Sequence, residues 1–317
     1  MILEIVLFLA GIALMFKGSD FFVEASVGIG ERARLPRVVV GGTLVSIATT
    51  SPELVVSIVS GIERAPGLAV GNALGSAAVN LGFIFALAAI LRPFELSPGE
   101  LRWRSQVILG LTALLFLMTI DLRLPQWRGL ILVAIGVIYL FVDYRRGMGR
   151  YAEHGEALGS AVTAKYTTVR KIAFFFSLGT AMVVGGSILL VNSGTAIAAA
   201  LGVPRIVLGL TMIAIGTSLP ELATAIAAVR KRVFDLAAGN LIGANALNLT
   251  LVAGTAASIS PLELTRMTQV YTFPAILLIF AAFFMFVRTK HGLARWEGAV
   301  IMGLYLAFIA GLTVLQL

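Results

Sequence analysis

The sequence has no cysteine, only two histidines and little charge. Without cysteine there can be no disulfide and no thiolate metal site. His154 and His291 both lie in charged segments between apolar runs, so zinc, haem and Cys or His nucleophile chemistry are not expected. Charged residues make up 13% of the 317 residues, roughly half the share in soluble domains. The chain therefore has few means of facing water, and an extramembrane enzyme domain does not fit into it.

Long apolar runs are what the chain has instead, and 59% of its residues are hydrophobic. A run of about 20 apolar residues is long enough to cross the hydrocarbon core of a bilayer. Residues 1–16 lack a basic n-region and a small-residue cleavage site, so they are expected to begin a retained helix. The sequence predicts an all-α polytopic membrane protein with ten transmembrane helices, at residues 2–27, 38–62, 65–91, 105–120, 129–142, 172–204, 206–229, 236–262, 267–287 and 298–317.

The net charge of +8 comes from short basic clusters between these spans. Such clusters encode membrane orientation, so the expected partner is the lipid bilayer, and nucleic acid is not expected. With ten spans, the loops on one side carry 18 Lys and Arg and those on the other side carry 5. The positive-inside rule then predicts a multi-pass protein of the cell membrane (plasma or inner membrane) with the N- and C-termini outside and a flexible connector in the cytoplasm.

The second half of the chain repeats residues of the first half at a constant offset. The offset is the distance in sequence from Gly11 to Gly179. It predicts a first five-helix repeat at 1–145, a cytoplasmic connector at 146–168 and a second repeat at 169–317. Five spans are an odd number, so the second repeat enters the membrane inverted, an arrangement found in secondary transporters with the substrate site on the pseudo-two-fold axis. The other matched residues include Gly18-Ser19 with Gly186-Ser187, Pro52-Glu53-Leu54 with Pro220-Glu221-Leu222, and Gly71-Asn72 with Gly239-Asn240.

Two glutamates at equivalent positions are the candidate functional residues. Glu53 and Glu221 are the only carboxylates well inside otherwise uncharged spans. Placing each charged side chain at the bilayer centre costs a few kcal/mol, so two of them at equivalent positions indicate a structural or functional role. One such role is a structural pairing with Lys or Arg, but Lys17 is the only basic residue expected within a span. The other is the binding of a cation.

Oxygen ligands surround both glutamates in the sequence. Pro52 and Pro220 cannot donate a backbone hydrogen bond, so the carbonyls near Ala48 and Gly216 are expected to be free. Carboxylate, amide, hydroxyl and carbonyl oxygens, without nitrogen or sulfur, suit calcium or sodium. The polar neighbours on the same helix faces are Thr49, Thr50, Thr217, Ser218, Asn72, Ser76, Asn80, Asn240 and Asn248.

At these residues the chain resembles the sodium/calcium exchanger family of the calcium/cation antiporter superfamily. The second repeat reads Gly216-Thr217-Ser218-Leu219-Pro220-Glu221 and the first Ala48-Thr49-Thr50-Ser51-Pro52-Glu53. The resemblance implies alternating access by sliding of helices 1 and 6, and a central calcium site of Glu53 and Glu221 with the carbonyls of Thr49 and Thr217. It also implies an outer sodium site of Ser76, Thr217, Ser218 and the Ala214 carbonyl, an inner one of Ser46, Thr49, Thr50 and position 244, and a middle position flanked by Asn80 and Asn248.

The expected function is an antiporter that exchanges Ca²⁺ for Na⁺, with no cofactor and no obligatory protein partner. Family members often have Asp at position 248 and Ser at position 244, where this chain has Asn248 and Ala244. Only two carboxylates remain, so exchange of Ca²⁺ for H⁺ by the same glutamates is an alternative. An intramembrane hydrolase or a channel fits the paired glutamates poorly, and a catalytic residue is not expected.

Overall fold

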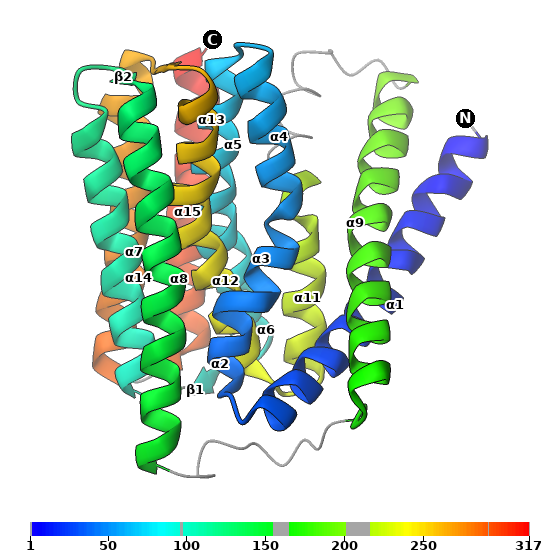
Figure 1. Cartoon of the computed structure of the whole chain (residues 1–317). Coiled ribbons are helices and arrows are strands. Elements are labelled where there is room, and N and C mark those ends of the chain that lie inside the picture. Colours follow the sequence, from blue (N-terminus) through cyan, green and yellow to red (C-terminus); the bar gives the residue numbers. More distant parts are fainter. Residues whose placement is uncertain (1, 96–97, 155–164, 201–215, 291, 317) are drawn as a thin grey trace.

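The computed structural model describes residues 2–95, 98–154, 165–200, 216–290 and 292–316. They form long helices joined by short connections (Figure 1). The first half contains α1 (Ile2–Ala33), α2 (Arg37–Val40), η1 (Gly41–Val45), α3 (Ser46–Thr49), α4 (Ser51–Ile62), α5 (Pro66–Ala78), η2 (Val79–Phe85), α6 (Ala86–Leu91), β1 (Phe94–Glu95), α7 (Pro98–Met118), β2 (Arg123–Leu124) and α8 (Gln126–His154). The second half contains α9 (Val169–Ala200), α11 (Leu219–Arg230), α12 (Phe234–Leu247), η4 (Asn248–Val252), α13 (Ala253–Ile259), β3 (Leu262–Glu263), η5 (Thr268–Thr272), α14 (Phe273–Lys290), β4 (Gly292–Leu293) and α15 (Arg295–Gln316). The η segments are π-helical turns within longer helices.

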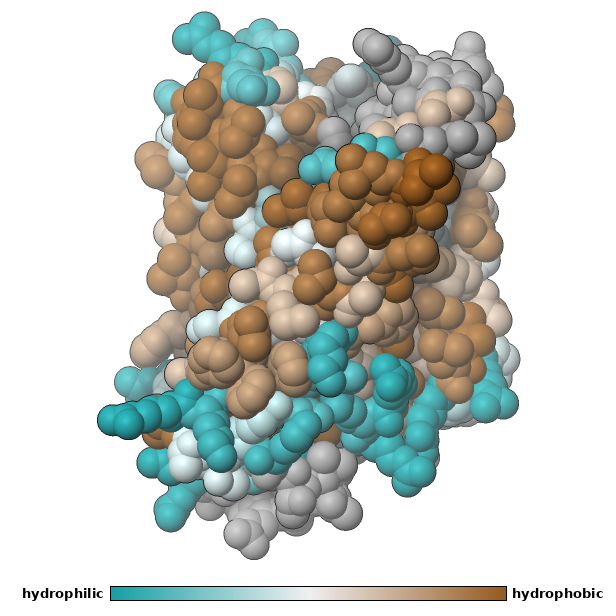
Figure 2. Space-filling model, turned by 90° about the vertical axis from the view of Figure 1, so that its right-hand side faces the viewer, coloured by the Kyte–Doolittle hydropathy of each residue, from teal (hydrophilic) through white to brown (hydrophobic). Residues whose placement is uncertain are grey.

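Eight helices in the described part are long and apolar enough to span a membrane, and α2 to α4, bent by 44°, are together long and apolar enough for a ninth. They coincide with nine of the ten predicted spans, which confirms a helical multi-pass membrane protein. The predicted seventh span, 206–229, lies partly outside the described residues, and α11 is its described part. Figure 2 shows a hydrophobic belt above a hydrophilic rim, with further hydrophilic residues at the upper left, as expected of a protein in a bilayer.

Two predicted boundaries are wrong. The span predicted at 129–142 is part of a helix that continues to His154, so the first residues of the predicted flexible connector are helical. Loss of hydrophobicity marks where a helix leaves the lipid, whereas the helix itself ends only where its backbone hydrogen bonds end. Likewise α7 begins at Pro98 rather than near residue 105.

α1 and α9 lie side by side at one edge of the molecule (Figure 1). They cross where glycines replace side chains: a Cβ on Gly11 would lie 2.9 Å from the Gly186 carbonyl oxygen, and one on Gly18 would lie 3.1 Å from that of Gly179. All four glycines belong to the repeat found in the sequence. Small residues at such crossings let helix backbones approach closely in lipid.

Two short antiparallel strand pairs join the halves of the chain. β1 pairs with β4, and β2 pairs with β3. β1 and β3 occupy equivalent positions of the repeat, and each strand of one half pairs with a strand of the other half. The remaining helices pack around a large apolar core that includes Leu81, Phe85, Phe273 and Phe280.

Candidate cation-binding site

Two helix starts bring the predicted glutamates into the protein interior. Glu53 lies in the first turn of α4 and Glu221 in the first turn of α11, each directly after a proline in that turn. Proline is favoured in the first turn because its missing N–H would lack an intrahelical partner there anyway. The residues that precede these helices have nearly the same backbone, with φ −81° and ψ −1° at Thr50 and φ −87° and ψ 4° at Ser218.

Both glutamate side chains are completely buried. Neither carboxylate oxygen of Glu53 has a hydrogen-bond partner among the described residues, and the same holds for Glu221 Oε2. Glu221 Oε1 accepts a bond from the Thr50 hydroxyl at 3.4 Å. A buried carboxylate without partners is costly. Three carboxylate oxygens are therefore buried without a hydrogen-bond partner in the described part of the chain.

Basic side chains do not neutralise this pair within the described residues. Lys17 is exposed and stacks over the Phe21 ring, with its nitrogen 4.9 Å from the ring centroid. Arg104 was predicted to lie in a loop, but it is fully buried in α7 and pairs with Asp143 of α8 at 2.9 Å. The prediction that Lys17 is the only basic residue within a span is thus wrong, because Arg104 lies in the candidate span Leu101–Met118. The inference drawn from it, that Glu53 and Glu221 have no basic partner, still holds for the described residues because Arg104 pairs with Asp143.

Two asparagines bond to threonines of the opposite half. The Thr49 hydroxyl donates to Asn240 Oδ1 at 3.0 Å, and the Thr217 hydroxyl donates to Asn72 Oδ1 at 3.4 Å. The two pairs occupy equivalent positions of the repeat. The amide of Asn72 also donates to the Glu53 carbonyl oxygen at 2.9 Å, and that of Asn240 donates to the Thr224 hydroxyl at 3.1 Å. These bonds fix α5 against α4 and α12 against α11, and they join the two halves at the site.

Other predicted ligands lie in the same buried region. The Ser76 hydroxyl lies 3.3 Å from that of Thr217. Asn80 and Asn248 lie at the beginning of the π-helical turns η2 and η4, are fully buried, and have no hydrogen-bond partner in the described part. The Ser218 hydroxyl is also buried without a described partner. Ala214 lies outside the described residues.

Some predicted ligands are already bonded to the backbone. The Ser46 hydroxyl donates to the Gly42 carbonyl at 2.8 Å and to that of Thr43 at 3.0 Å. The carbonyls of Ala48 and Gly216, expected to be free, accept bonds from Ser51 at 2.7 Å and from Ser187 at 2.8 Å. Hydroxyls one turn away or on a neighbouring helix satisfy such carbonyls readily.

Ser187 of α9 is a residue of this region that the sequence analysis did not name as a ligand. Its match with Ser19 in the repeat was the only signal for it. A narrow crevice lined by side chains of α1, α9 and α11 reaches Thr49 and Thr224. The site therefore adjoins the α1–α9 pair. In the described part there is no cluster of three His, Cys, Asp or Glu residues, so a cation here would rest on two carboxylates and neutral oxygens.

The sequence matches the profile of the sodium/calcium exchanger protein family over residues 3–145 and 171–314. It is 32% identical to the inner membrane protein YrbG of Escherichia coli over 98% of this chain and 97% of that protein. It is 28% identical to the sodium/calcium exchanger MaX1 of Methanosarcina acetivorans, over 95% and 96%. The solved structure of the sodium-calcium exchanger NCX_Mj, soaked with 2.5 mM Na⁺ and 0.1 mM Ca²⁺, superposes with a TM-score of 0.86 at 27% identity, over 98% of each chain. With its fold and profile in agreement, this chain is a multi-pass membrane transporter that belongs to the sodium/calcium exchanger family.

Proposed function

We propose that this protein exchanges Ca²⁺ for Na⁺ across the cell membrane by alternating access at a site built around Glu53 and Glu221. The observation that carries the proposal is the pair of fully buried glutamates with three carboxylate oxygens that have no partner in the described structure. A divalent cation would satisfy those oxygens and neutralise both charges. Relatives named as sodium/calcium exchangers support the choice of ions.

The proposed ligands are those that the resemblance to the sodium/calcium exchanger family implies. Glu53 and Glu221 bind calcium with the carbonyls of Thr49 and Thr217. Sodium binds to neutral oxygens on either side: Ser76, Thr217, Ser218 and the Ala214 carbonyl at the outer end, and Ser46, Thr49 and Thr50 at the inner end. Asn80 and Asn248, whose amides are buried without described partners, flank the middle of the site.

Ten helices in two inverted repeats, 1–145 and 169–317, with a cytoplasmic connector at 146–168, are the proposed architecture. Several structural features that recur at the spacing of the repeat support it. Two equivalent hydrogen bonds, Thr49 to Asn240 and Thr217 to Asn72, each join one half of the chain to the other. The two strand pairs also each join a strand of the first half to one of the second half. Arg64 and Arg232 share a positive φ, 54° and 59°. In addition, α1 begins and α15 ends at the same end of the molecule, as an even number of crossings requires (Figure 1).

Sodium coupling is tested by flux into liposomes. With both glutamates ionised, one Ca²⁺ neutralises the pair and three Na⁺ leave it positive, so three-for-one exchange would be electrogenic. We expect an outward sodium gradient at fixed pH to drive calcium uptake, with low apparent sodium affinity. Uptake driven only by a pH gradient, with no effect of sodium between about pH 6 and 8, would instead support Ca²⁺/H⁺ exchange.

The proton alternative is favoured by one specific feature, the methyl group at position 244. Ala244 is fully buried in α12, and its side chain has no oxygen. A lost ligand leaves sodium under-coordinated where water is excluded. We expect Ala244→Ser to lower the sodium concentration for half-maximal exchange and to leave that for calcium nearly unchanged. Parallel sodium and calcium titrations of both proteins check this, and an unchanged sodium titration contradicts it.

Orientation is tested with single cysteines, since the chain has none of its own. The basic residues predict that the connector faces the cytoplasm. A cysteine in place of Ala157, which lies outside the described residues, should be labelled by an impermeant maleimide only after the cells are opened. A cysteine in place of Gln126, at the start of α8 beyond the opposite end, is the control and should react in intact cells. Labelling of position 157 in intact cells would reverse the proposed orientation.

A further inference from the structure

A buried ion pair joins α7 and α8 in the first half of the chain, and the second half has no equivalent of it. Arg104 of α7 and Asp143 of α8 are both fully buried, and their nitrogen and oxygen lie 2.9 Å apart. The equivalent positions of the second repeat are Thr272 and Gly311, which cannot form such a pair. Burying two charges is expensive, and an apolar pair is often as stable, so stability alone does not account for it.

The pair packs directly against the π-helical turn η1. A Cβ on Gly42 would lie 2.3 Å from an Arg104 guanidinium nitrogen and 2.9 Å from an Asp143 carboxylate oxygen. A side chain at position 42 would therefore displace the end of the Arg104 side chain. On its other side Gly42 meets α12, because a Cβ on Gly243 would lie 2.6 Å from the Gly42 carbonyl oxygen. Gly42 is thus held between the ion pair and the helix that carries Asn240 and Ala244.

Hydrogen bonds continue from Gly42 to the carboxylates. The Ser46 hydroxyl donates to the Gly42 carbonyl at 2.8 Å, and the Ser46 carbonyl accepts from the Thr50 backbone N–H at 2.8 Å. The Thr50 hydroxyl in turn reaches Glu221 Oε1 at 3.4 Å. The ion pair therefore contacts η1, and a chain of hydrogen bonds leads from η1 through Ser46 and Thr50 to Glu221.

We propose that Arg104 and Asp143 are positioning residues that set the sodium affinity of the exchanger through Gly42 and Ser46. The inference rests on the proposed function. Sodium binding depends on how neutral oxygens converge, and those of Ser46, Thr49 and Thr50 follow directly on η1. Calcium shares the Thr49 carbonyl of α3 but relies mainly on the charges of Glu53 and Glu221, which belong to α4 and α11. A disturbance of η1 therefore weakens sodium more than calcium.

The test measures exchange of calcium for calcium in sodium-free liposomes and its inhibition by added sodium. The variant is Arg104→Met/Asp143→Leu. It removes both charges at once, so neither is left buried without a partner of opposite charge. We expect about a threefold to tenfold rise in the sodium concentration for half inhibition. The calcium concentration for half-maximal exchange should stay within about twofold. Gly42→Ala, which disturbs the same contact without changing a charge, should shift sodium in the same way.

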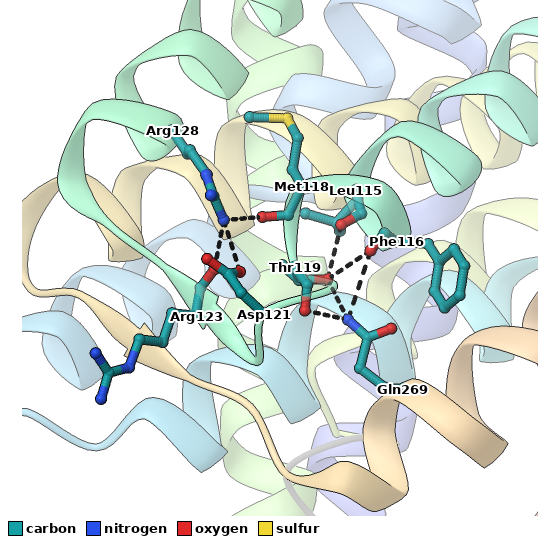
Figure 3. A network of polar contacts seen from close by, with 8 residues as sticks. All are labelled: Leu115, Phe116, Met118, Thr119, Asp121, Arg123, Arg128 and Gln269. Atoms are coloured by element: carbon teal, nitrogen blue, oxygen red, sulfur yellow. Dashed lines mark hydrogen bonds and ion pairs between the residues drawn. The ribbon is translucent and has the colours of Figure 1, made fainter.

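The matched control is an ion pair at the other end of the same helix pair, between Arg128 of α8 and Asp121 in the turn that follows α7. Arg128 donates to Asp121 at 2.7 Å and to the Met118 carbonyl at 2.6 Å (Figure 3). The described hydrogen bonds of this pair reach none of the proposed ligands. Arg128→Met/Asp121→Leu should leave both ion titrations unchanged. If Gly42→Ala and the Arg104/Asp143 double variant keep the normal sodium titration, or shift sodium and calcium equally, the inference is overturned. Absence of any sodium effect in the unaltered protein would overturn the proposed coupling itself, and with it this inference.

Discussion

Glu53→Gln and Glu221→Gln are each expected to lower calcium flux by roughly 100-fold or more, because removing one partner of a buried charge pair costs about 3 kcal/mol or more. A divalent cation held by a single carboxylate would remain uncompensated in a low-dielectric site. In the protein without bound cations, replacing a glutamate by glutamine removes a buried carboxylate whose oxygens lack partners among the described residues. The thermal unfolding midpoint in chelator should therefore stay the same or rise.

The measurements are calcium uptake into liposomes and thermal unfolding of the purified protein. Glu63→Gln is the matched control, since Glu63 is exposed just after the end of the same helix α4. It should leave both flux and stability unchanged. Near-normal calcium flux in either Glu53→Gln or Glu221→Gln would remove these glutamates from the centre of the site.

Gly239→Ala is expected to destabilise the protein by about 1–3 kcal/mol or more, as overpacking of a tight interior does. A Cβ at this position would lie 2.1 Å from the Val38 carbonyl oxygen and 3.0 Å from the Gly42 nitrogen. Both are backbone atoms, which cannot rotate away as a side chain can. Relief requires that α12 move away from α2 and η1, and Asn240 would move with it.

The first repeat supplies the control for this prediction. Gly71 is the equivalent of Gly239 in the repeat, yet no described atom lies within 4 Å of a Cβ placed there. Gly71→Ala should leave the thermal midpoint unchanged or raise it, because alanine favours a helix interior over glycine by about 0.5–1 kcal/mol. Equal effects of the two substitutions would show that the contact at Gly239 carries no strain.

The spans could be predicted from sequence because lipid demands long apolar runs, and most of them coincide with helices of the structure. Helix ends could not, since α8 continues past its apolar part to His154. The two strand pairs were not expected either. β1 and β4 each have two residues, too few for an alternating pattern to appear in the sequence.

Glu53 and Glu221 stood out because each is a charge in an apolar span and each has a copy. The hydrogen bonds around these glutamates could not be predicted from the sequence. Thr49 meets Asn240, and Ser187 meets the Gly216 carbonyl, only through packing of distant segments. Arg104 and Asp143 were hidden for a different reason. They lie at the margins of their apolar runs, where a charge ordinarily faces water.

The strand pairs also bear on how the chain is assembled during synthesis. β1 lies near the end of the third span, but its partner β4 comes only just before the last helix, α15. Loop closure over such a distance is slow compared with local helix formation. The backbone of β1 therefore waits for its hydrogen bonds until nearly the whole chain has left the ribosome and entered the bilayer. Completion of the first half is thus a late step of folding, which depends on the synthesis of the second half.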